Sequence, residues 1–525
     1  MPAAAALAVD HLLEASGAEW FLFWDPALGE PPAGAIDALV ADRGDVFHGG
    51  LLLGMAGLPQ EVDLVQPSWW FVVDAPPGIQ SVSWRLSLRS CLVRTGVLRS
   101  LGHLDPAFAS LDGAALDLGW RCLARGAIVF HDPRLGPAGA AGPGSPVSLP
   151  AGDRYLFLLR HYPRRWARYV LARRILGRRP IGEVRRFRRA RELASTSPPP
   201  APPSSVYTRP GPERAAGSEG AVTVIVPTLG RPTLVAAVLD DLRRQTVRPS
   251  AVIVVDQNGE GDGGPYDGFA DLPLTVIRQS DTGQWLARNA ALQAAQDDLL
   301  LFLDDDSRIG LDFVERHLEG LASYRADISA GASLSVVGAP VPESYAFFRA
   351  ADQFDSGNAL VRRQVLARVG GFDRQYDRMR GGDADFGTRV YLTGGLAVHN
   401  PRAARSHLKA AEGGLRSFGS WDSFRQLGHL SPKPLPSVVY YLRRWFSPRQ
   451  VREALLIGLV QAAVPYHLKR RASPRQWAGF LASEAVRLPL TAVRVARSLR
   501  AARRMLAAGP HIPAVAPPSS VSGAP

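Results

Sequence analysis

The run LLLFLDDD (299–306) joins five consecutive apolar residues to three aspartates. Three further apolar or β-branched runs precede it, namely VTVIVPT (222–228), AVIVVDQ (251–257) and LTVIRQ (274–279). Helix-like stretches at 232–245 and 284–296 lie between these runs, and the first has a proline in its tolerated first turn. Continuous apolar strands that alternate with helices predict an α/β fold with a mostly parallel sheet covered on both faces.

Aspartates stand where the predicted strands end, which is where ligands of such sheets bind. Asp256 ends the second run, and Asp304, Asp305 and Asp306 follow the fourth. A divalent cation such as Mg2+ or Mn2+ relieves the repulsion between crowded carboxylates. Because alternate side chains of an extended segment share a face, Asp304 and Asp306 are expected to point together and Asp305 away. A solvated turn, or a helix cap at Asp306, explains the same residues equally well at this stage.

A second acidic cluster lies in GGDADFGTRVYLTGG (381–395), near the start of a helical stretch. The positive end of the helix dipole tolerates acids there, so Asp383 or Asp385 could be a cap. The other interpretation is a general base that takes a proton from an attacking hydroxyl. His407 follows in a segment without helical periodicity, and it is structural unless it lies beside a metal.

These segments, in this order, resemble the family 2 glycosyltransferases, whose catalytic domain has the GT-A fold. The nucleotide-binding half is matched by VTVIVPTLGRP, VIVVDQN, SDTGQWLARNAAL and LLLFLDDDSR. The acceptor half is matched by GNALVRRQVLARVGGFD (357–373), GGDADFGTRVYLTGG and RSHLK. The resemblance covers about 220–410 and implies a nucleotide-sugar donor together with a divalent metal, Mn2+ or Mg2+.

The resemblance also implies a role for each matching residue. Thr228 and Asp256 would hold the base and ribose, Pro227 would shape the first loop, and Arg288 would face the donor. Asp304 and Asp306 match the first and last carboxylates of the DxD motif, so that Asp304 would contact both donor and metal. Asp383 matches the catalytic aspartate, and His407 matches the histidine that completes the metal site. One departure is that Gly382 stands where the family usually has a glutamate.

The residues then predict a single displacement, in which Asp383 accepts the acceptor's proton while the acceptor oxygen attacks the anomeric carbon and inverts its configuration. The predicted function is a metal-dependent, inverting glycosyltransferase that acts on a hydroxyl of a glycan or polyprenyl-linked saccharide, as in polysaccharide synthesis for the cell envelope. Two alternatives stay open: a catalytically silent scaffold that binds glycan or partner proteins, and a basic nucleic-acid-binding protein. The second is disfavoured, because no recognised nucleic-acid motif accompanies the charge.

The first part of the chain repeats part of this pattern. LVRTGVLRSLGHLDPAF (92–108) aligns without gaps on 360–376, and 113–133 aligns on 381–401 at the same offset. WFLFWDPAL (20–28) resembles 299–307, but Pro26 and Ala27 replace two of the aspartates, and Ala115 replaces Asp383. We therefore expect a degenerate, non-catalytic GT-A-like body that serves packing, dimerisation into a homo-oligomer, or acceptor binding.

The repeat also bears on one acid in the second cluster. Asp117 and Arg121 persist in the first body at the positions of Asp385 and Arg389. This persistence predicts that Asp385 is structural and pairs with Arg389 at i+4.

Composition divides the chain further. We expect bodies at 1–150 and 221–435, basic helical segments at 151–192 and 436–508, a Pro/Ser-rich linker at 193–220 and a disordered tail at 509–525. The net charge of +13 is concentrated, because 154–191 holds 14 Arg against one acid and 436–505 holds 14 Lys and Arg against two.

The basic helices with interleaved aromatic residues suit an anionic membrane surface, although a solvated helix face explains them too. The chain has no stretch of about 20 apolar residues, no convincing leader and only two cysteines. The sequence therefore predicts a cytoplasmic protein, peripheral on the inner face of the cell membrane.

Overall fold

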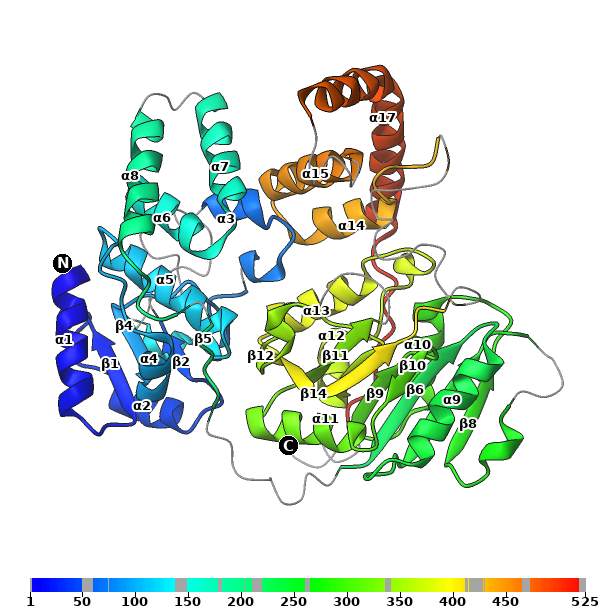
Figure 1. The fold of residues 1–525 in the computed structure, drawn as a ribbon. Helices are drawn as coiled ribbons and strands as arrows, with labels where there is room; N and C mark the ends of the chain where they lie inside the picture. Colours follow the sequence, from blue (N-terminus) through cyan, green and yellow to red (C-terminus); the bar gives the residue numbers. More distant parts are fainter. Residues whose placement is uncertain are drawn as a thin grey trace.

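The computed structural model describes residues 2–49, 60–73, 75–136, 149–177, 182–202, 204–209, 220–259, 265–335, 341–410, 414, 428, 430–464 and 473–518. Within them the chain forms two bodies, each built on its own sheet, and both bodies carry helices on the same side of the molecule (Figure 1).

The second body contains a nine-stranded sheet in the order β10-β14-β11-β13-β9-β6-β7-β8, with β12 paired to β14. Its strands are β6 (Val222–Thr228), β7 (Ala251–Asp256), β8 (Leu274–Arg278), β9 (Leu299–Leu303), β10 (Ser307–Ile309), β11 (Ile328–Ser335), β12 (Arg349–Ala350), β13 (Asn358–Arg362) and β14 (Ala397–His407). Its helices are α9 (Pro232–Arg243), α10 (Gln284–Ala294), α11 (Phe313–Tyr324), α12 (Arg363–Val369) and α13 (Gly382–Leu392). The predicted α/β class is confirmed.

The four apolar runs are the strands β6 to β9, and they pair in parallel as predicted. Every residue of β6 and β9 is buried, which explains why these strands are apolar throughout rather than alternating. The other half of the sheet is mixed, because β13 lies between β9 and β11 and is antiparallel to both. A mostly parallel sheet is therefore correct only for the half that contains β6 to β9, since apolar runs alone do not specify strand direction.

The first body repeats the mixed half of that sheet. Its elements are α1 (Pro2–Ala15), β1 (Trp20–Trp24), α2 (Ala33–Val40), β2 (Val46–His48), α3 (Gln60–Val65), β3 (Ser81–Val82), β4 (Ser90–Arg94), α4 (Thr95–Leu101), α5 (Leu111–Ala124) and β5 (Val129–His131). Its order β1-β4-β2-β5-β3 matches β9-β13-β11-β14-β12, with the same strand directions. The register also agrees, because Trp20 pairs with Arg94 as Leu299 pairs with Arg362. Within the described residues, β1 is the edge strand and has no counterpart of β6 to β8 beside it.

The two basic segments form the helices α6 (Ala151–His161), α7 (Arg164–Leu176) and α8 (Gly182–Thr196), and then α14 (Pro436–Trp445), α15 (Pro448–Ala463) and α17 (Pro474–Ala508). These helices extend the internal repeat, because α6 and α14 make equivalent ion pairs with their own bodies. Arg160 of α6 pairs with Asp105 at 3.0 Å, as Arg444 of α14 pairs with Asp373 at 3.1 Å. None of the described helices is long and apolar enough to cross a membrane.

Aromatic residues of the first body pack on α13 of the second. The ring of Trp70 lies against Gly387, where an added Cβ would come within 2.3 Å of it. Phe71 and Tyr391 meet edge to face with centroids 5.4 Å apart, and the Tyr391 hydroxyl donates to the Val73 carbonyl at 3.0 Å. The helix that carries the second acidic cluster is thus held by both bodies.

The prediction of a disordered tail over 509–525 is wrong for residues 509–518. Beyond α17 the chain crosses back to the second body, where Gly371 donates to the Pro513 carbonyl at 2.9 Å and Arg374 to the His511 carbonyl at 3.2 Å. The His511 amide donates to Asp373 at 3.0 Å. Backbone hydrogen bonds order this segment in spite of its Pro- and Ala-rich composition.

Candidate functional site

Asp304 lies just beyond the carboxyl end of β9, between two arginines. Arg288 of α10 donates to its Oδ1 at 2.6 Å, and Arg405 of β14 donates to its Oδ2 at 3.0 Å. Both arginine side chains are only 1% exposed. Arg288 also donates to the Ser356 carbonyl at 3.0 Å, so it connects Asp304 to the backbone of a neighbouring loop.

Asp306 and His407 complete a set of three ligand groups with Asp304. One atom from each residue lies within 4.8 Å of the others, and Asp306 Oδ2 is 3.3 Å from His407 Nε2. Burial acts to raise the pKa of Asp306, but the hydrogen bond with His407 leaves it below its ordinary value. The two carboxylates suit Mn2+ or Mg2+, and the imidazole beside them suits a transition-metal ion such as Mn2+.

Asp305 points away from this group, as the alternation along an extended segment predicts. It accepts a hydrogen bond from the Thr228 hydroxyl at 2.8 Å and pairs with Arg231 at 2.8 Å. Burial raises the pKa of Asp305 to about 6, against the opposing effect of Arg231. In this structure the Thr228 hydroxyl therefore orients the loop after β9.

Asp256 ends β7 at the same edge of the sheet. It accepts hydrogen bonds from the Tyr266 hydroxyl at 2.7 Å and from the Asn258 side chain at 2.6 Å. Pro227 lies beside Val255 in the pairing of β6 with β7. The structure thus brings the predicted donor residues to one edge, with Asp256 shielded by Tyr266.

The segment Asp355–Gly357 joins the two acidic clusters. The Ser356 amide donates to Asp383 Oδ1 at 3.0 Å, and Asp355 pairs with Arg405 at 3.0 Å. Gly357 is pressed against Asp304, because an added Cβ would lie 2.1 Å from Oδ2 of that residue. This segment connects Asp383 in the first turn of α13 to the carboxylate beyond β9.

A cleft of about 1090 Å³ opens beside these residues. Asp383, Asp355, Arg405 and His407 all line it. The structure therefore places the predicted base and one of the predicted metal ligands in a single cavity.

Trp285 explains why glycine stands before Asp383. A Cβ at Gly382 would lie 2.3 Å from the indole of Trp285, which itself is fully buried. The space that a glutamate would need is filled by this ring. The resemblance alone could not reveal this, because Trp285 lies almost a hundred residues upstream.

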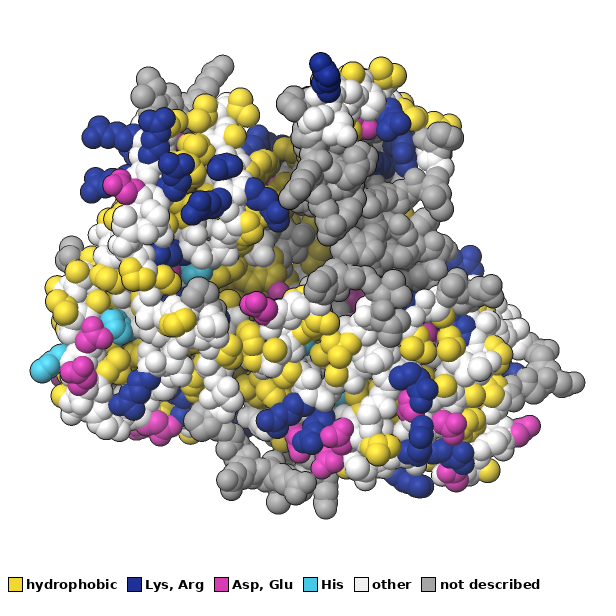
Figure 2. Space-filling view, viewed as in Figure 1, with side chains coloured by type: hydrophobic (Ala, Val, Ile, Leu, Met, Phe, Trp, Pro, Cys, Tyr) yellow, Lys and Arg dark blue, Asp and Glu magenta, His cyan; other side chains and the backbone are white. Residues whose placement is uncertain are grey.

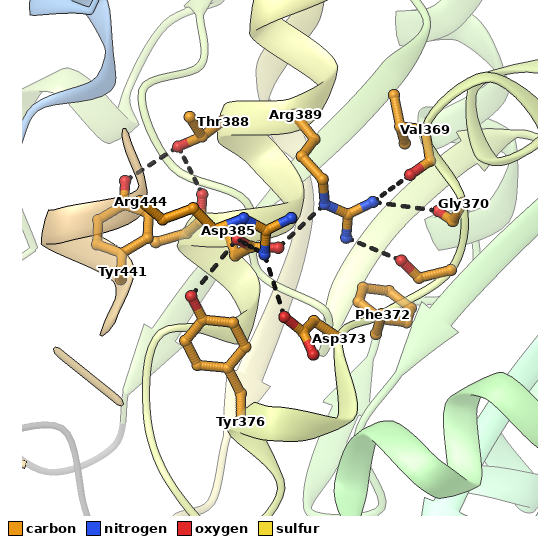
Figure 3. Close-up of polar contacts among 12 residues, drawn as sticks. Val369, Gly370, Phe372, Asp373, Tyr376, Asp385, Thr388, Arg389, Tyr441 and Arg444 are labelled. Atoms are coloured by element: carbon orange, nitrogen blue, oxygen red, sulfur yellow. Dashed lines mark hydrogen bonds and ion pairs between the residues drawn. The ribbon is translucent and has the colours of Figure 1, made fainter. Parts of the chain in front are cut away.

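Asp385 is a structural residue, as the repeat predicts (Figure 3). It is fully buried and accepts from Arg389 at 3.0 Å, from Arg444 and from Trp445, the last two at 2.9 Å. Asp117 makes the equivalent contacts with Arg121 and His161, both at 2.8 Å. The paired arginines also bind equivalent carbonyl groups, at 101–103 in the first body and at 369–371 in the second.

We expect Asp385→Asn and Asp117→Asn each to destabilise its own body by about 3–5 kcal/mol, because each leaves buried arginine without its carboxylate. Differential scanning calorimetry should show a lowered transition for each variant. The matched control is Asp312→Asn, which breaks a partly exposed i,i+4 pair with Arg316 and should cost no more than about 0.5 kcal/mol. Equal effects in all three variants would contradict a structural role for the buried pairs.

Three residues of the site were not predicted, namely Arg231, Asp355 and Arg405. Arg231 follows β6 in TLGRP, Asp355 precedes β13, and Arg405 lies two residues before His407. Each is a charged residue beside a motif named in the sequence analysis, and the sequence gives no other indication of its role. Their roles depend on contacts between segments about 50 to 100 residues apart.

Comparisons with known proteins relate part of this chain to glycosyltransferases. Residues 223–372 match the family model described as Glycosyl transferase family 2. The chain is 28% identical over 102 residues to "Uncharacterized glycosyltransferase YwdF" of Bacillus subtilis (strain 168), over 19% of this chain and 37% of that protein. It is 29% identical over 113 residues to "Glycosyltransferase GlyA" of Streptococcus pneumoniae serotype 4, over 21% and 16% respectively. The match thus spans well under half the length of these curated relatives.

Solved structures of low identity were also found. One is a mannosyltransferase from Pyrobaculum calidifontis, PcManGT, in complex with GDP-Man and Mn2+, at 19% identity, 55% of this chain, 86% of that chain and a TM-score of 0.35. Another is S. aureus TarS 1–349 in complex with UDP-GlcNAc, at 18% identity, 54% of this chain, 81% of that chain and a TM-score of 0.38.

Proposed function

Since residues 223–372 form a domain of glycosyl transferase family 2, we propose that this protein transfers a sugar from a nucleotide-sugar donor to a hydroxyl of a glycan or lipid-linked saccharide, with inversion. The observation that carries the proposal is the placement of Asp383 and His407 in one cleft, with His407 grouped with Asp304 and Asp306. Retention of these groups, where the first body has Ala115 and Ala27, argues against a silent scaffold.

Asp304, Asp306 and His407 would hold the divalent metal, Mn2+ or Mg2+. When bound, such an ion neutralises negative charge on a departing diphosphate. Arg288 and Arg405 orient the Asp304 carboxylate through the hydrogen bonds described above. Arg231, 3.5 Å from Asp306, adds a positive charge at the same edge.

Asp383 is placed to act as the general base. The Ser356 amide fixes its Oδ1, and the side chain lines the cleft where an acceptor hydroxyl would enter. A second carboxylate nucleophile is not supplied by Asp385, because that residue is buried in ion pairs. The burial of Asp385 supports our proposal of one displacement, and hence of inversion.

The test is a panel of UDP-, GDP- and dTDP-sugars with Mn2+ and a crude glycan or lipid extract, scored by release of free nucleotide. We expect at least one donor to turn over, and EDTA to abolish the reaction. If every donor stayed inert with both extracts, the proposed activity would be wrong.

Gly357→Ala is expected to lower kcat/KM by about 100-fold, because the new Cβ forces Asp304 or its loop to shift, and a misplacement of about 1 Å has that effect. Steady-state kinetics with the active donor would measure it. Gly268→Ala is the control, since a Cβ there meets nothing within 4 Å. Activity of Gly357→Ala equal to that of the control would show that the loop tolerates displacement.

We also propose that the helices α7, α8 and α17 hold the protein against the inner, anionic face of the cell membrane. Lys and Arg side chains gather on the group of helices at the upper left of Figure 2, and a few more lie on the group at the upper right. Large apolar side chains are exposed among them, with Leu176 at 76% and Val486 at 82%. Each basic residue near such a surface contributes about 1 kcal/mol.

Flotation with vesicles of phosphatidylglycerol and phosphatidylcholine tests the membrane proposal. Binding should rise with the anionic fraction and fall with salt. A gel shift with DNA and RNA, run beside it, tests the nucleic-acid alternative. Tight, salt-sensitive binding to nucleic acid without flotation would contradict the membrane proposal and favour a nucleic-acid-binding function.

A further inference from the structure

The cleft beside Asp383 is not enclosed by the second body alone. One wall comes from the first body, through Gln66, Trp69 and Trp70 and through Tyr162 and Trp166 at the junction of α6 and α7. The facing wall comes from α14 and α15, including Tyr441, Ile457 and Gln461. Because α6–α7 and α14–α15 are equivalent parts of the repeat, the cleft lies between two related pairs of helices.

Hydrogen bonds and an ion pair join the two walls through residues that do not line the cleft. Glu453 of α15 is fully buried, pairs with Arg173 of α7 and accepts from the Tyr169 hydroxyl at 2.9 Å. Gln450 donates to Asp63 of α3 at 3.4 Å. These bonds fix the first body's helices at a set position relative to Asp383.

The lining combines aromatic faces with hydrogen-bonding groups. Besides the indoles and phenols, it includes Gln66, Gln353, Asp352, Asp355 and Gln461. A cleft for a prenyl chain would be apolar throughout, whereas a pyranose ring presents an apolar C–H face and a rim of hydroxyls. The C–H face suits the negative face of an aromatic ring, and the hydroxyls suit carboxylates and amides.

Trp69 and Trp166 are both half-buried tryptophans of the first body in the lining. Trp69 packs in a ring cluster with Trp84 and Trp120, so Trp166 is the better placed of the two for such stacking. It is half-buried and lines the cleft, whereas Trp70 is 4% exposed and packed on Gly387. Tyr162, also in the lining, has its hydroxyl bonded to Gln66 at 3.1 Å. The cleft volume of about 1090 Å³ is slightly above the range of small-molecule pockets, about 300–1,000 Å³, and has room for more than one sugar ring.

We infer that the first body completes the acceptor site, and that a saccharide of at least two rings binds along this wall with one ring stacked on Trp166. This inference rests on the proposed function and narrows it. It also gives the degenerate body a role in substrate binding, although that body lacks the carboxylates of the second.

Saturation-transfer NMR on the full chain tests it, with maltose, cellobiose, lactose, chitobiose and mannobiose as probes. We expect at least one disaccharide to receive saturation at its ring C–H protons, with a Kd at least tenfold weaker for Trp166→Ala and restored by Trp166→Phe. Trp20→Ala is the matched control, because Trp20 lies on β1 outside the cleft and packs against Phe47. Its Kd should equal that of the unaltered protein.

Three results would overturn the inference: no disaccharide binds, Trp166→Ala binds as the unaltered protein does, or Trp20→Ala weakens binding as much as Trp166→Ala. Saturation of farnesyl phosphate in place of the sugars would assign the cleft to a lipid instead. Hydrolysis of the donor with Mn2+, followed in the same preparations, separates this inference from the proposed function. Inert donors would contradict the function, whereas normal hydrolysis with an unchanged sugar Kd in Trp166→Ala would contradict only the acceptor wall.

Discussion

Replacing Asp383 with asparagine is expected to lower kcat by about 1,000-fold, within the range that a positioned general base contributes. The amide keeps the size of the side chain and can still accept from the Ser356 amide, so the loop should stay in place. It cannot take the acceptor's proton. The KM for the donor should stay unchanged, because the predicted donor residues lie at the ends of β6, β7 and β9 instead.

Steady-state kinetics of Asp383→Asn would be compared with those of Asp312→Asn. Asp312 does not line the cleft and pairs with Arg316 at 2.9 Å, so the control makes the same chemical change away from the base. Its kcat should fall by less than tenfold. If Asp383→Asn kept a tenth or more of the unaltered kcat, another group would have to be the base.

The second large effect is expected from Asp306→Ala. This change removes a carboxylate from the group of three and leaves His407 without its partner. We expect activity to fall at least 1,000-fold, and the thermal stabilisation by Mn2+ to disappear. For the unaltered chain, a ligand at 100 times its Kd stabilises by about 2.7 kcal/mol.

Thermal unfolding with Mn2+ and with EDTA would measure this stabilisation. The first body supplies the control, since Asp25 there corresponds to Asp304 but is followed by Pro26 and Ala27. Asp25→Ala should leave the Mn2+ effect intact. Stabilisation of Asp306→Ala by Mn2+ equal to that of the unaltered protein would place the metal elsewhere.

The sequence was sufficient for those parts of the site that depend on local geometry. Alternation along an extended segment predicted that Asp304 and Asp306 would lie together, and the internal repeat predicted the pairing of Asp385 with Arg389. The parallel pairing of β6 to β9 also followed from apolar runs that alternate with helices. In each case, neighbouring residues carry enough information.

Other parts depend on contacts that no local pattern encodes. Arg288 was expected to face the donor, but its burial behind Asp304 results from the approach of α10 to the loop at Ser356. The use of Trp285 to fill the space at Gly382 likewise requires the folded structure. The basic segments were interpreted from their charge and interleaved aromatic residues, and this obscured their equivalence. That equivalence becomes visible only in the structure, where Arg160 and Arg444 form ion pairs with aspartates at corresponding positions of the two bodies.

The ordered segment after α17 has a mechanical consequence. The helices α14, α15 and α17 leave the second body through α14, which is packed on α13, and return to it through the backbone hydrogen bonds of His511 and Pro513. A lid needs a free end and a hinge that absorbs rotation, and this group of helices has both of its ends anchored. Its wall of the cleft is therefore pre-organised, and a bound substrate would lose little free energy to rearranging it.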